Sequence, residues 1–400
     1  MVSVLPSQPA TMRGRLGWLL QAQQLERKEE EGIRVLQLIK CLDRGGAERL
    51  VTTMVTRGDR SRIRYEVAFV RSDMGGLVGE LRRSGVPVHD LGATGDFDLA
   101  WLWRLRQLLV KRRFDIVHAH LPYAAGLGRV AVRTMHPGRR PRFVYTEHSL
   151  WDRNTLVTRV LGRATSRWDD ASIAVAESNR AALPRSIRQR TRVIVHGIDL
   201  AQTVADATRG PSIRTELGVP PDHLIVVSVA NLRLQKAYPV LLAAARSLVD
   251  AGVPVTFLAA GSGPMEAELR AQHRRLALGD RFRFLGQRAD APALIAASDV
   301  LVLASDFECM PVVVMEAFAL GTVVVATSVG DVPLVVEDQV NGLLVPPGRA
   351  DLLTAALRRV LADPDLRAAL AAAGALAAGR FDVRRTDAEV TKVYNEVLAR

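Results

Sequence analysis

Cysteine, aromatic side chains and long apolar runs are all scarce in this sequence of 400 residues. Its two cysteines, Cys41 and Cys309, lie far apart, so the chain offers neither a disulfide framework nor a cysteine-based zinc site. No uncharged apolar stretch reaches the roughly 18 residues that a membrane-spanning helix needs, and the first residues lack the hydrophobic core of an export signal. These absences predict a cytoplasmic protein, in which cysteines stay reduced.

The chain has an ordinary globular composition with an uneven distribution of charge. Hydrophobic residues make up 48% of it and charged residues 24%, which excludes a disordered or fibrous protein, and its length predicts two domains. Residues 1–200 contain 34 Lys and Arg against 20 Asp and Glu, whereas residues 201–400 contain 20 against 22. The basic first half suits an anionic membrane, a phosphorylated substrate or nucleic acid, and charge alone does not choose among them.

Short runs rich in Val, Ile and Leu alternate with helical patterns of roughly ten to fifteen residues, which predicts βαβ units and parallel sheets. The predicted strands of the first half are 33–39, 65–70, 86–91, 115–120, 143–147, 172–176 and 192–195. Those of the second half are 224–230, 255–260, 281–285, 300–304, 323–327 and 342–345. Two doubly wound domains of similar plan follow, with ligands expected at the carboxyl ends of the strands.

The domain boundaries are predicted from where this alternation stops and resumes. A segment with Gly210-Pro211 and Pro220-Pro221 interrupts it and suits an interdomain connection. The expected parts are a loosely ordered extension (1–32), a first domain that binds the acceptor (33–200), a linker (201–222), a second domain that binds the nucleotide sugar (223–380) and a C-terminal helix (381–400) that packs back on the first domain.

Two loops at strand ends have residues suited to phosphate. Gly45 and Gly46 precede a helix, whose N-terminal amides and dipole favour an anion, although paired glycines also mark ordinary turns. Arg233 and Lys236 follow the strand 224–230, where they would neutralise a diphosphate leaving group. The alternative for the second loop is a solvated turn with incidental cations.

The segment 306–318 gives the sharpest signal of the chain. Pro311 suits the first turn of a helix, which places Glu308 just ahead of that helix and Glu316 inside it. An acid in so apolar a run is costly to bury unless sugar or ribose hydroxyls donate to it, and the backbone of residues 309–311 would meet an anion. The alternative is that Glu316 pairs with a core arginine and Glu308 complements the helix dipole at the surface.

Four histidines lie at strand ends of the first half, namely His118, His120, His148 and His196. His118 and His120 alternate on one strand, so one of them points into a cleft or both lie on one face. His148 follows a strand directly and is the preferred cleft histidine. Each histidine has a structural alternative, and a metal site would need ligands that the sequence does not show.

Two further motifs are interpreted as structural, with no ligand bound to them. The spacing Gly126-Leu127-Gly128 lies inside a predicted helix, where it indicates close packing and no nucleotide fingerprint. The pairs Asp96 with Asp98 and Asp363 with Asp365 precede helical runs and are interpreted as helix caps, not as a metal site.

Taken together, these segments resemble the retaining nucleotide-sugar glycosyltransferases of family 4, which have the GT-B architecture of two facing Rossmann-like domains. The resemblance covers about residues 33–400. It is carried above all by Glu308 and Glu316, spaced eight apart, and by the segments 321–327 and 341–348. The segments 45–48, 115–121 and 197–199 add to it.

For the donor, the resemblance implies that Glu308 contacts the sugar hydroxyls, Glu316 the ribose and Lys236 the diphosphate, with Arg233 beside Lys236. The backbone around Arg288 would meet the base. The amides near Cys309, Met310 and Pro311 would help to hold the donor, and Gly45 and Gly46 would lie against it from the other domain. No metal and no other cofactor is expected.

For the reaction, the resemblance implies catalysis by Glu308, His148 and Lys236 through orientation and charge, with no protein nucleophile. His148 and His120 would lie on the side of the acceptor, a saccharide or a lipid-linked molecule. Transfer would be hexosyl transfer with retention, in polysaccharide or glycoconjugate biosynthesis. Contact with an anionic inner membrane face is expected, and binding of nucleic acid is not.

Six positions depart from the family pattern. They are Cys309, Ala237 and Asp331, where glycine is usual, Leu334 in place of glutamate, His196 in place of asparagine, and Asn231 where an arginine usually accompanies Lys236. Two alternatives therefore stay open. One is a nucleotide-sugar epimerase or hydrolase of the same fold, which would consume donor without acceptor, and the other is a catalytically silent scaffold or regulatory subunit.

Overall fold

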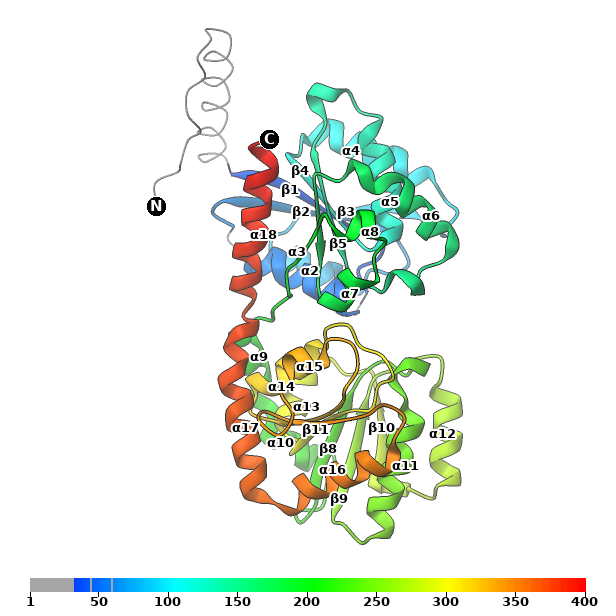
Figure 1. The fold of residues 1–400 in the computed structure, drawn as a ribbon, viewed down its shortest axis with the longest axis vertical. Helices are drawn as coiled ribbons and strands as arrows, with labels where there is room; N and C mark the ends of the chain where they lie inside the picture. The colour runs from blue at the N-terminus through cyan, green and yellow to red at the C-terminus, as the bar shows by residue number, and fades with distance from the viewer. Residues whose placement is uncertain (1–31, 44, 59) are drawn as a thin grey trace. The chain divides into compact units, whose positions relative to one another are not determined.

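The structure is a computed structural model that describes residues 32–400 apart from 44 and 59 (Figure 1). The extension predicted for residues 1–32 therefore lies almost wholly outside the described residues. By its internal contacts the chain divides into two units. Among the described residues, the first unit comprises those from 32 to 146, 160–171 and 394–400, and the second comprises residues 147–159 and 172–393.

A seven-stranded sheet has the order β3-β2-β1-β4-β5-β6-β7. Its strands are β1 (Ile33–Ile39), β2 (Ile63–Arg71), β3 (Val88–Ala93), β4 (Ile116–His120), β5 (Arg142–Glu147), β6 (Ala171–Ala174) and β7 (Thr191–Val193). The pairings of β1 are parallel, with Val35 opposite both Tyr65 and Ile116. Six of the seven residues of β1 are buried, as expected of a strand covered on both faces.

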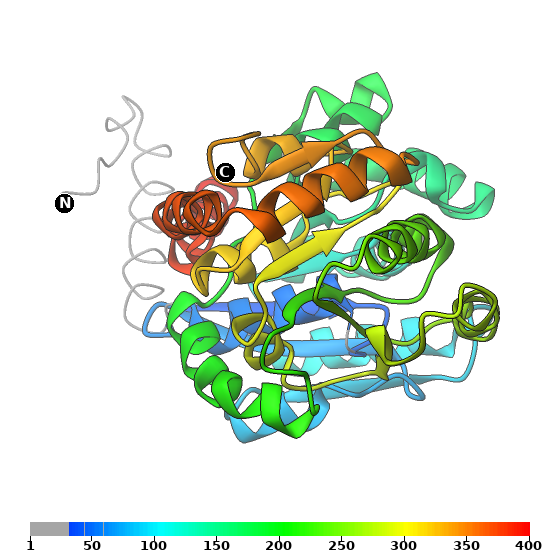
Figure 2. The same cartoon turned by 90° about the horizontal axis from the view of Figure 1, so that it is seen from below.

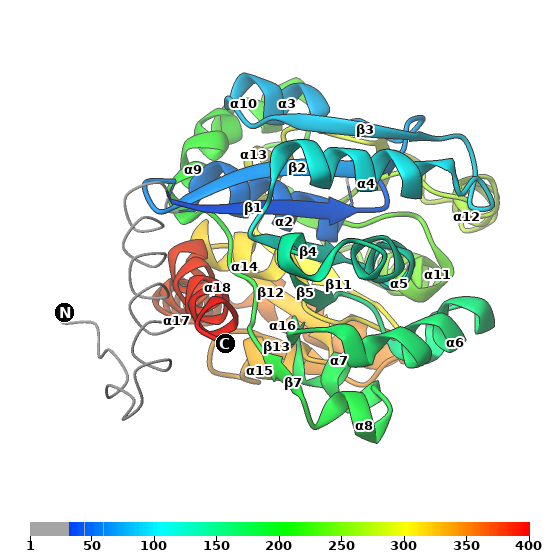
Figure 3. The ribbon, with the colours of Figure 1, turned by 90° about the horizontal axis from the view of Figure 1, so that it is seen from above.

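The helices that follow these strands cover the sheet. They are α2 (Gly46–Arg57), α3 (Val78–Arg83), α4 (Ala100–Arg112), α5 (Pro122–Arg133), α6 (Leu156–Thr165), α7 (Glu177–Ala182) and α8 (Arg185–Arg188). Figure 3 shows α4 and α5 side by side, and α4 packs on β3 as well. A Cβ at Gly128 would lie 2.7 Å from the side chain of Leu38 on β1, so the predicted close packing of this helix is confirmed.

The second sheet has six strands in the order β10-β9-β8-β11-β12-β13, with helices on both of its faces (Figure 2). Its strands are β8 (Leu224–Val229), β9 (Val255–Ala260), β10 (Phe282–Gly286), β11 (Val300–Leu303), β12 (Val323–Thr327) and β13 (Leu343–Val345). Its helices are α11 (Tyr238–Asp250), α12 (Glu266–Arg275), α13 (Ala291–Ala296), α14 (Val312–Ala319), α15 (Val332–Val335), α16 (Ala350–Ala362) and α17 (Pro364–Ala378). Every predicted strand is present, with ends that agree within two residues.

The segment predicted as a linker, residues 201–222, holds α9 (Leu200–Asp206) and α10 (Gly210–Glu216). Both helices pack within the second unit, α9 against α14 and α10 against α13. Ile213 is fully buried in the core there, and Arg214 pairs with Asp299 at 3.2 Å. The prolines and glycines of this segment thus punctuate short packed helices.

One aspartate of each predicted pair accepts from an amide at the start of a helix. Asp363 caps α17 by accepting from the amide of Leu366, and Asp98 accepts from the amide of Ala100 at the start of α4. Asp96 has a different function, because it forms ion pairs with Lys40 and Arg71.

A buried polar network fastens the last helix, α18 (Val383–Leu398), to the first sheet. The hydroxyl of Tyr394 lies 2.6 Å from Nδ1 of His118 and accepts from the amide of Gln37 at 3.2 Å. Nε2 of His118 lies 2.6 Å from the hydroxyl of Thr146, and Nε2 of His120 lies 2.7 Å from Oε1 of Gln37. Both histidines are buried, on one face of β4, with ring centroids 4.3 Å apart.

Tyr394→Phe should lower the free energy of unfolding by about 1–3 kcal/mol, because it leaves buried polar groups of His118 and Gln37 without their shared partner. Urea denaturation measures this. Tyr123→Phe is the matched control: its hydroxyl donates to the carbonyl of Asp96 at the surface, so a change of less than about 0.5 kcal/mol is expected. Equal effects of the two substitutions would contradict a stabilising network.

Candidate functional site

Two strand ends of the second unit, those of β8 and β11, converge on one carboxylate. Glu308 lies in the loop between β11 and α14, and Lys236 lies in the loop between β8 and α11. Nζ of Lys236 donates to Oε1 of Glu308 at 2.6 Å. The hydroxyl of Ser305 donates to the same oxygen at 2.7 Å. Two residues predicted independently as donor contacts are thus in direct contact with each other.

The loops that hold this pair are fixed by their own backbones. The amide of Asp306 donates to the carbonyl of Gln235 at 2.9 Å, which ties the β11 loop to the β8 loop. The hydroxyl of Thr327, at the end of β12, donates to the carbonyl of Ser305 at 2.5 Å. Gly330, with φ of +52°, follows β12 and approaches so closely that a Cβ would lie 1.7 Å from the carbonyl oxygen of Glu308.

Burial makes the charges of the pair effective. The side chains of Glu308 and Lys236 are 9% and 21% exposed, so water screens them less than at an open surface. Burial, with the charge of Glu308 adding to it, raises the pKa of the nearby Tyr238 to about 12, and its hydroxyl donates to the carbonyl of Ala230. A half-buried cation beside a buried carboxylate is an arrangement that can bind phosphate and hydroxyl groups at once.

The helix after Glu308 begins one residue later than expected. α14 starts at Val312, and Pro311 precedes it with ψ of 99°, so this proline lies outside the first turn. Its carbonyl accepts from the amide of Val314 at 3.0 Å. Glu316 lies inside α14 and is half-buried, and Met310 in the preceding loop is half-buried too. Burial raises the pKa of Cys309 to about 11, so this thiol stays neutral near pH 7.

The two predicted arginines lie in different environments. Arg233, in the loop with Lys236, is exposed. The guanidinium of Arg288 pairs with Asp290 at 2.6 Å and Glu216 at 3.3 Å, and the hydrogen bond that it donates to Asp290 leads the causes that raise its pKa. Arg288 thus fixes the loop after β10 through its side chain, and a contact of its backbone with a base stays a prediction.

In the first unit, Gly45 precedes α2 and Gly46 is its first residue. No atom lies within 4 Å of a Cβ built at Gly46, whereas one at Gly45 would lie 2.2 Å from the carboxylate of Glu48. Glu48 accepts from the thiol of Cys41 at 3.0 Å, and burial raises the pKa of that thiol to about 12. The chain's own carboxylate therefore complements the dipole of this helix, and a donor contact would be at Gly46.

The predicted cleft histidine, His148, is half-buried and stacks on His196, with ring centroids 5.2 Å apart and an angle of 14° between the planes. His196 is buried, which lowers its pKa to about 4, and among the described residues none hydrogen-bonds to its Nε2. His120, predicted beside His148, lies instead in the buried network of the first sheet. Its role towards an acceptor stays a prediction.

Three departures from the family pattern have a visible effect on the chain. Ala237 adopts φ of 45° and ψ of 40°, a left-handed conformation that glycine reaches without steric cost, directly after Lys236. The carboxylate of Asp331 accepts from the amide of Ser178 at 3.0 Å, within the second unit. The amide of Asn179 donates to the sulfur of Cys309 at 3.3 Å. The side chains of Asp331 and Cys309 thus make contacts that glycine would not provide.

Some features of the site had only weak signals in the sequence. Ser305 directly follows a predicted strand, and that position was its one signal. The close approach of Gly330 and the stacking of His196 depend on tertiary contacts. Within residues 32–400, setting aside 44 and 59, no three His, Cys, Asp or Glu side chains are grouped to hold a metal ion. No helix in the same part of the chain is long and apolar enough to cross a bilayer.

Comparison with known families matches both halves of the chain. Residues 44–202 match the model "Glycosyltransferase Family 4", and residues 211–376 match the model "Glycosyl transferases group 1". The chain is a glycosyltransferase of family 4 with the GT-B architecture, and the predicted fold class and enzyme class are thereby confirmed.

Individual relatives agree with this assignment. The chain is 27% identical over 404 residues to the 2-deoxystreptamine glucosyltransferase of Streptomyces kanamyceticus, covering 92% of this chain and 99% of that one. It is 26% identical over 280 residues to the UDP-Gal:alpha-D-GlcNAc-diphosphoundecaprenol alpha-1,3-galactosyltransferase of Escherichia coli, covering 66% and 71%. The crystal structure of Anabaena HepE in complex with UDP and glucose superposes with a TM-score of 0.78 at 25% identity, covering 91% of this chain and all of that one.

Gly330→Ala should destabilise the protein by at least about 2 kcal/mol and reduce donor turnover, because the new Cβ collides with the backbone of Glu308 and displaces it. Thermal unfolding and turnover are measured on one preparation. Gly321→Ala is the control, since Gly321 has a similar φ of +67° but open space around its Cβ, and a cost of only about 1 kcal/mol is expected. A fully active Gly330→Ala would refute the close approach.

Acidification should destabilise the protein through His196. Between about pH 6.5 and pH 4 the unfolded chain binds a proton on this residue that the folded protein excludes, so the free energy of unfolding falls as the pH falls. From pH 7 to pH 5 the loss should be about 2 kcal/mol. Urea denaturation of the wild type and of His196→Asn at both pH values isolates this contribution, and equal pH dependence in the two proteins would contradict it.

Proposed function

We propose that this enzyme transfers a sugar, with retention, from a nucleotide diphosphate sugar to a saccharide or a lipid-linked acceptor. The observation that carries the proposal is the 2.6 Å contact between Lys236 and Glu308 at converging strand ends. The complex of HepE with UDP and glucose supports the class of donor, and the name of the Escherichia coli relative supports a lipid-linked acceptor.

In the proposed reaction, Lys236 binds the diphosphate and Glu308 accepts hydrogen bonds from hydroxyls of the donor sugar. Lys236 then exchanges one anionic partner for another, while Glu308 exchanges an ammonium donor for hydroxyl donors and keeps the hydroxyl of Ser305. Neither charge is left without a partner at any stage, which limits the cost of desolvation. The ion pair in the ligand-free protein therefore preorganises the donor site.

Transfer breaks the bond between the anomeric carbon and the diphosphate oxygen and forms a bond to the acceptor oxygen on the same face. The acceptor proton passes to the departing diphosphate, whose developing charge Lys236 stabilises. Glu316 is proposed to hold the ribose, the amides near Cys309 to bind phosphate, and Gly46 to contact the donor. His148, with its ring oriented by His196, is proposed to lie near the reacting carbon. No metal is required in this scheme.

The proposed setting is polysaccharide or glycoconjugate biosynthesis in the cytoplasm, at an anionic membrane face. The charge of the chain supports it, because residues 101–200 contain 19 Lys and Arg against 7 Asp and Glu. Electrostatic attraction to anionic lipids would bring the enzyme to a lipid-linked acceptor.

Glu308→Gln and Lys236→Gln should each reduce donor turnover at least tenfold, because a charged hydrogen bond is worth about 1.5–3 kcal/mol. Release of UDP from a panel of UDP-sugars, with and without acceptor, measures this. Glu266→Gln, which removes an exposed carboxylate paired with Arg270 on α12, is the matched control and should leave turnover unchanged.

Two outcomes would count against this assignment. Full turnover in both variants would remove Glu308 and Lys236 from the reaction. Complete consumption of donor by the wild type, at a rate independent of any acceptor, would identify a hydrolase or epimerase.

A further inference from the structure

The first unit has an apolar stripe on its surface, made of Phe97, Leu99, Trp103 and Val110, which are 98%, 53%, 63% and 46% exposed. Leu99 immediately precedes α4, and Trp103 and Val110 follow it by four and eleven positions, so the three side chains share one line along the helix. The opposite face of α4 is anchored in the core.

That anchoring face shows that α4 has no need of the apolar stripe for folding. Trp101, Leu105 and Leu109 of α4 are at most 2% exposed and pack among the strands and helices of the first unit. The helix is therefore already fixed by the usual buried positions. Large apolar side chains that remain in water on its other side call for a separate explanation.

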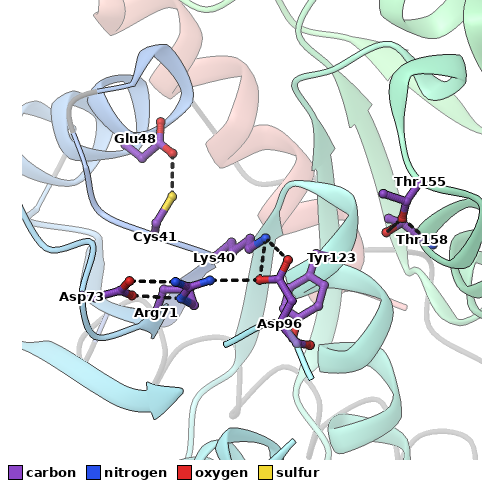
Figure 4. A network of polar contacts seen from close by, with 9 residues as sticks. All are labelled: Lys40, Cys41, Glu48, Arg71, Asp73, Asp96, Tyr123, Thr155 and Thr158. Carbon is purple, nitrogen blue, oxygen red and sulfur yellow. Dashed lines mark hydrogen bonds and ion pairs between the residues drawn. The ribbon is translucent and has the colours of Figure 1, made fainter. Parts of the chain in front are cut away.

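The loop that presents Phe97 is held firmly (Figure 4). Asp96 pairs with Lys40 at 2.8 Å and with Arg71 at 3.2 Å, and the hydroxyl of Tyr123 donates to its carbonyl at 2.6 Å. Asp98, on the other side of Phe97, accepts from the amides of Thr94 and Ala100. Phe97 is thus displayed on a fixed loop, which lowers the entropy that a partner must overcome when it binds this side chain.

Cations accompany the apolar stripe. From Ala100 to Arg112 the helix carries Arg104, Arg106, Lys111 and Arg112 and no acidic residue, and all four are exposed. Arg106 lies next to Trp103 and Val110 on the helix surface, and Lys111 lies on the other side of the same two residues. Of the acids nearby, Asp96 and Asp98 are engaged by the contacts of the loop, and Glu66 pairs with Arg112 of the helix at 3.8 Å.

We propose that the apolar stripe and its cations form a docking surface for an anionic phospholipid bilayer. The proposal rests on the proposed transfer to a lipid-linked acceptor, which such docking would bring within reach. Trp, Phe and Leu beside Arg and Lys are the side chains with which a helix lies in the plane of a bilayer interface, apolar groups among the acyl chains and cations at the headgroups.

The charge pattern favours a bilayer over the other occupants. A second copy of the chain would bring cations against cations, which costs free energy. A nucleic acid would satisfy the cations, but its phosphates would give Leu99 and Val110 no apolar partner. A bilayer offers acyl chains to the apolar side chains and anionic headgroups to the cations at once. Since no described helix is suited to span a membrane, this attachment would be peripheral and reversible.

Sedimentation with vesicles tests the proposal. The wild type should bind vesicles of phosphatidylglycerol mixed with phosphatidylcholine, and binding should weaken with salt. Phe97→Ser with Trp103→Ser should reduce this affinity at least tenfold, and so should Arg106→Glu with Lys111→Glu. Leu376→Ser on α17, where Leu376 is 86% exposed, and Arg358→Glu on α16 are matched controls and should bind as the wild type does.

Any of three results would overturn the docking surface. The first is a wild type that does not bind the anionic vesicles, and the second is docking variants that bind as well as the controls. The third is that the docking variants keep vesicle binding but lose self-association or RNA binding. Thermal stabilisation by UDP, measured on every variant, separates the failure of this proposal from the failure of the proposed function. The docking variants should retain this stabilisation. A wild type that UDP does not stabilise would refute only the proposed donor.

Discussion

The contact between Lys236 and Glu308 is the interaction on which the arrangement of the second unit's strand ends depends. The two side chains come from loops 72 positions apart in sequence, and each charge offsets part of the desolvation cost of the other. Ser305 and the close approach of Gly330 fix the carboxylate from two further directions. A site assembled in this way keeps its geometry before the substrate arrives, which is the condition for catalysis by orientation and charge.

Around this pair, two residues that differ from the family pattern, Asp331 and Cys309, make local contacts. Asp331 accepts from the amide of Ser178, and Cys309 accepts from the side chain of Asn179. Ala237 has no such compensation visible and carries a left-handed conformation beside Lys236. The departures therefore change residues around the pair, while the charged residues themselves, Lys236 and Glu308, are those that the family resemblance implies.

Much of the fold could be predicted from the sequence, because buried parallel strands are continuous apolar runs and their period is visible locally. Glu308 could be singled out because an acid beside Pro311 and an apolar helix is locally unusual. The partners of such residues could not, since pairing Glu308 with Lys236, or Tyr394 with His118, depends on contacts between distant segments. Burial of His120 was missed for the same reason, because the sequence does not show what covers the face of a strand.

A crystal structure of the protein with a bound nucleotide diphosphate sugar tests the central claim most directly. The account predicts that the contact between Lys236 and Glu308 opens or is shared, with the ammonium on the diphosphate and the carboxylate on hydroxyls of the sugar. A donor bound elsewhere, with these two side chains still paired only to each other, would contradict it.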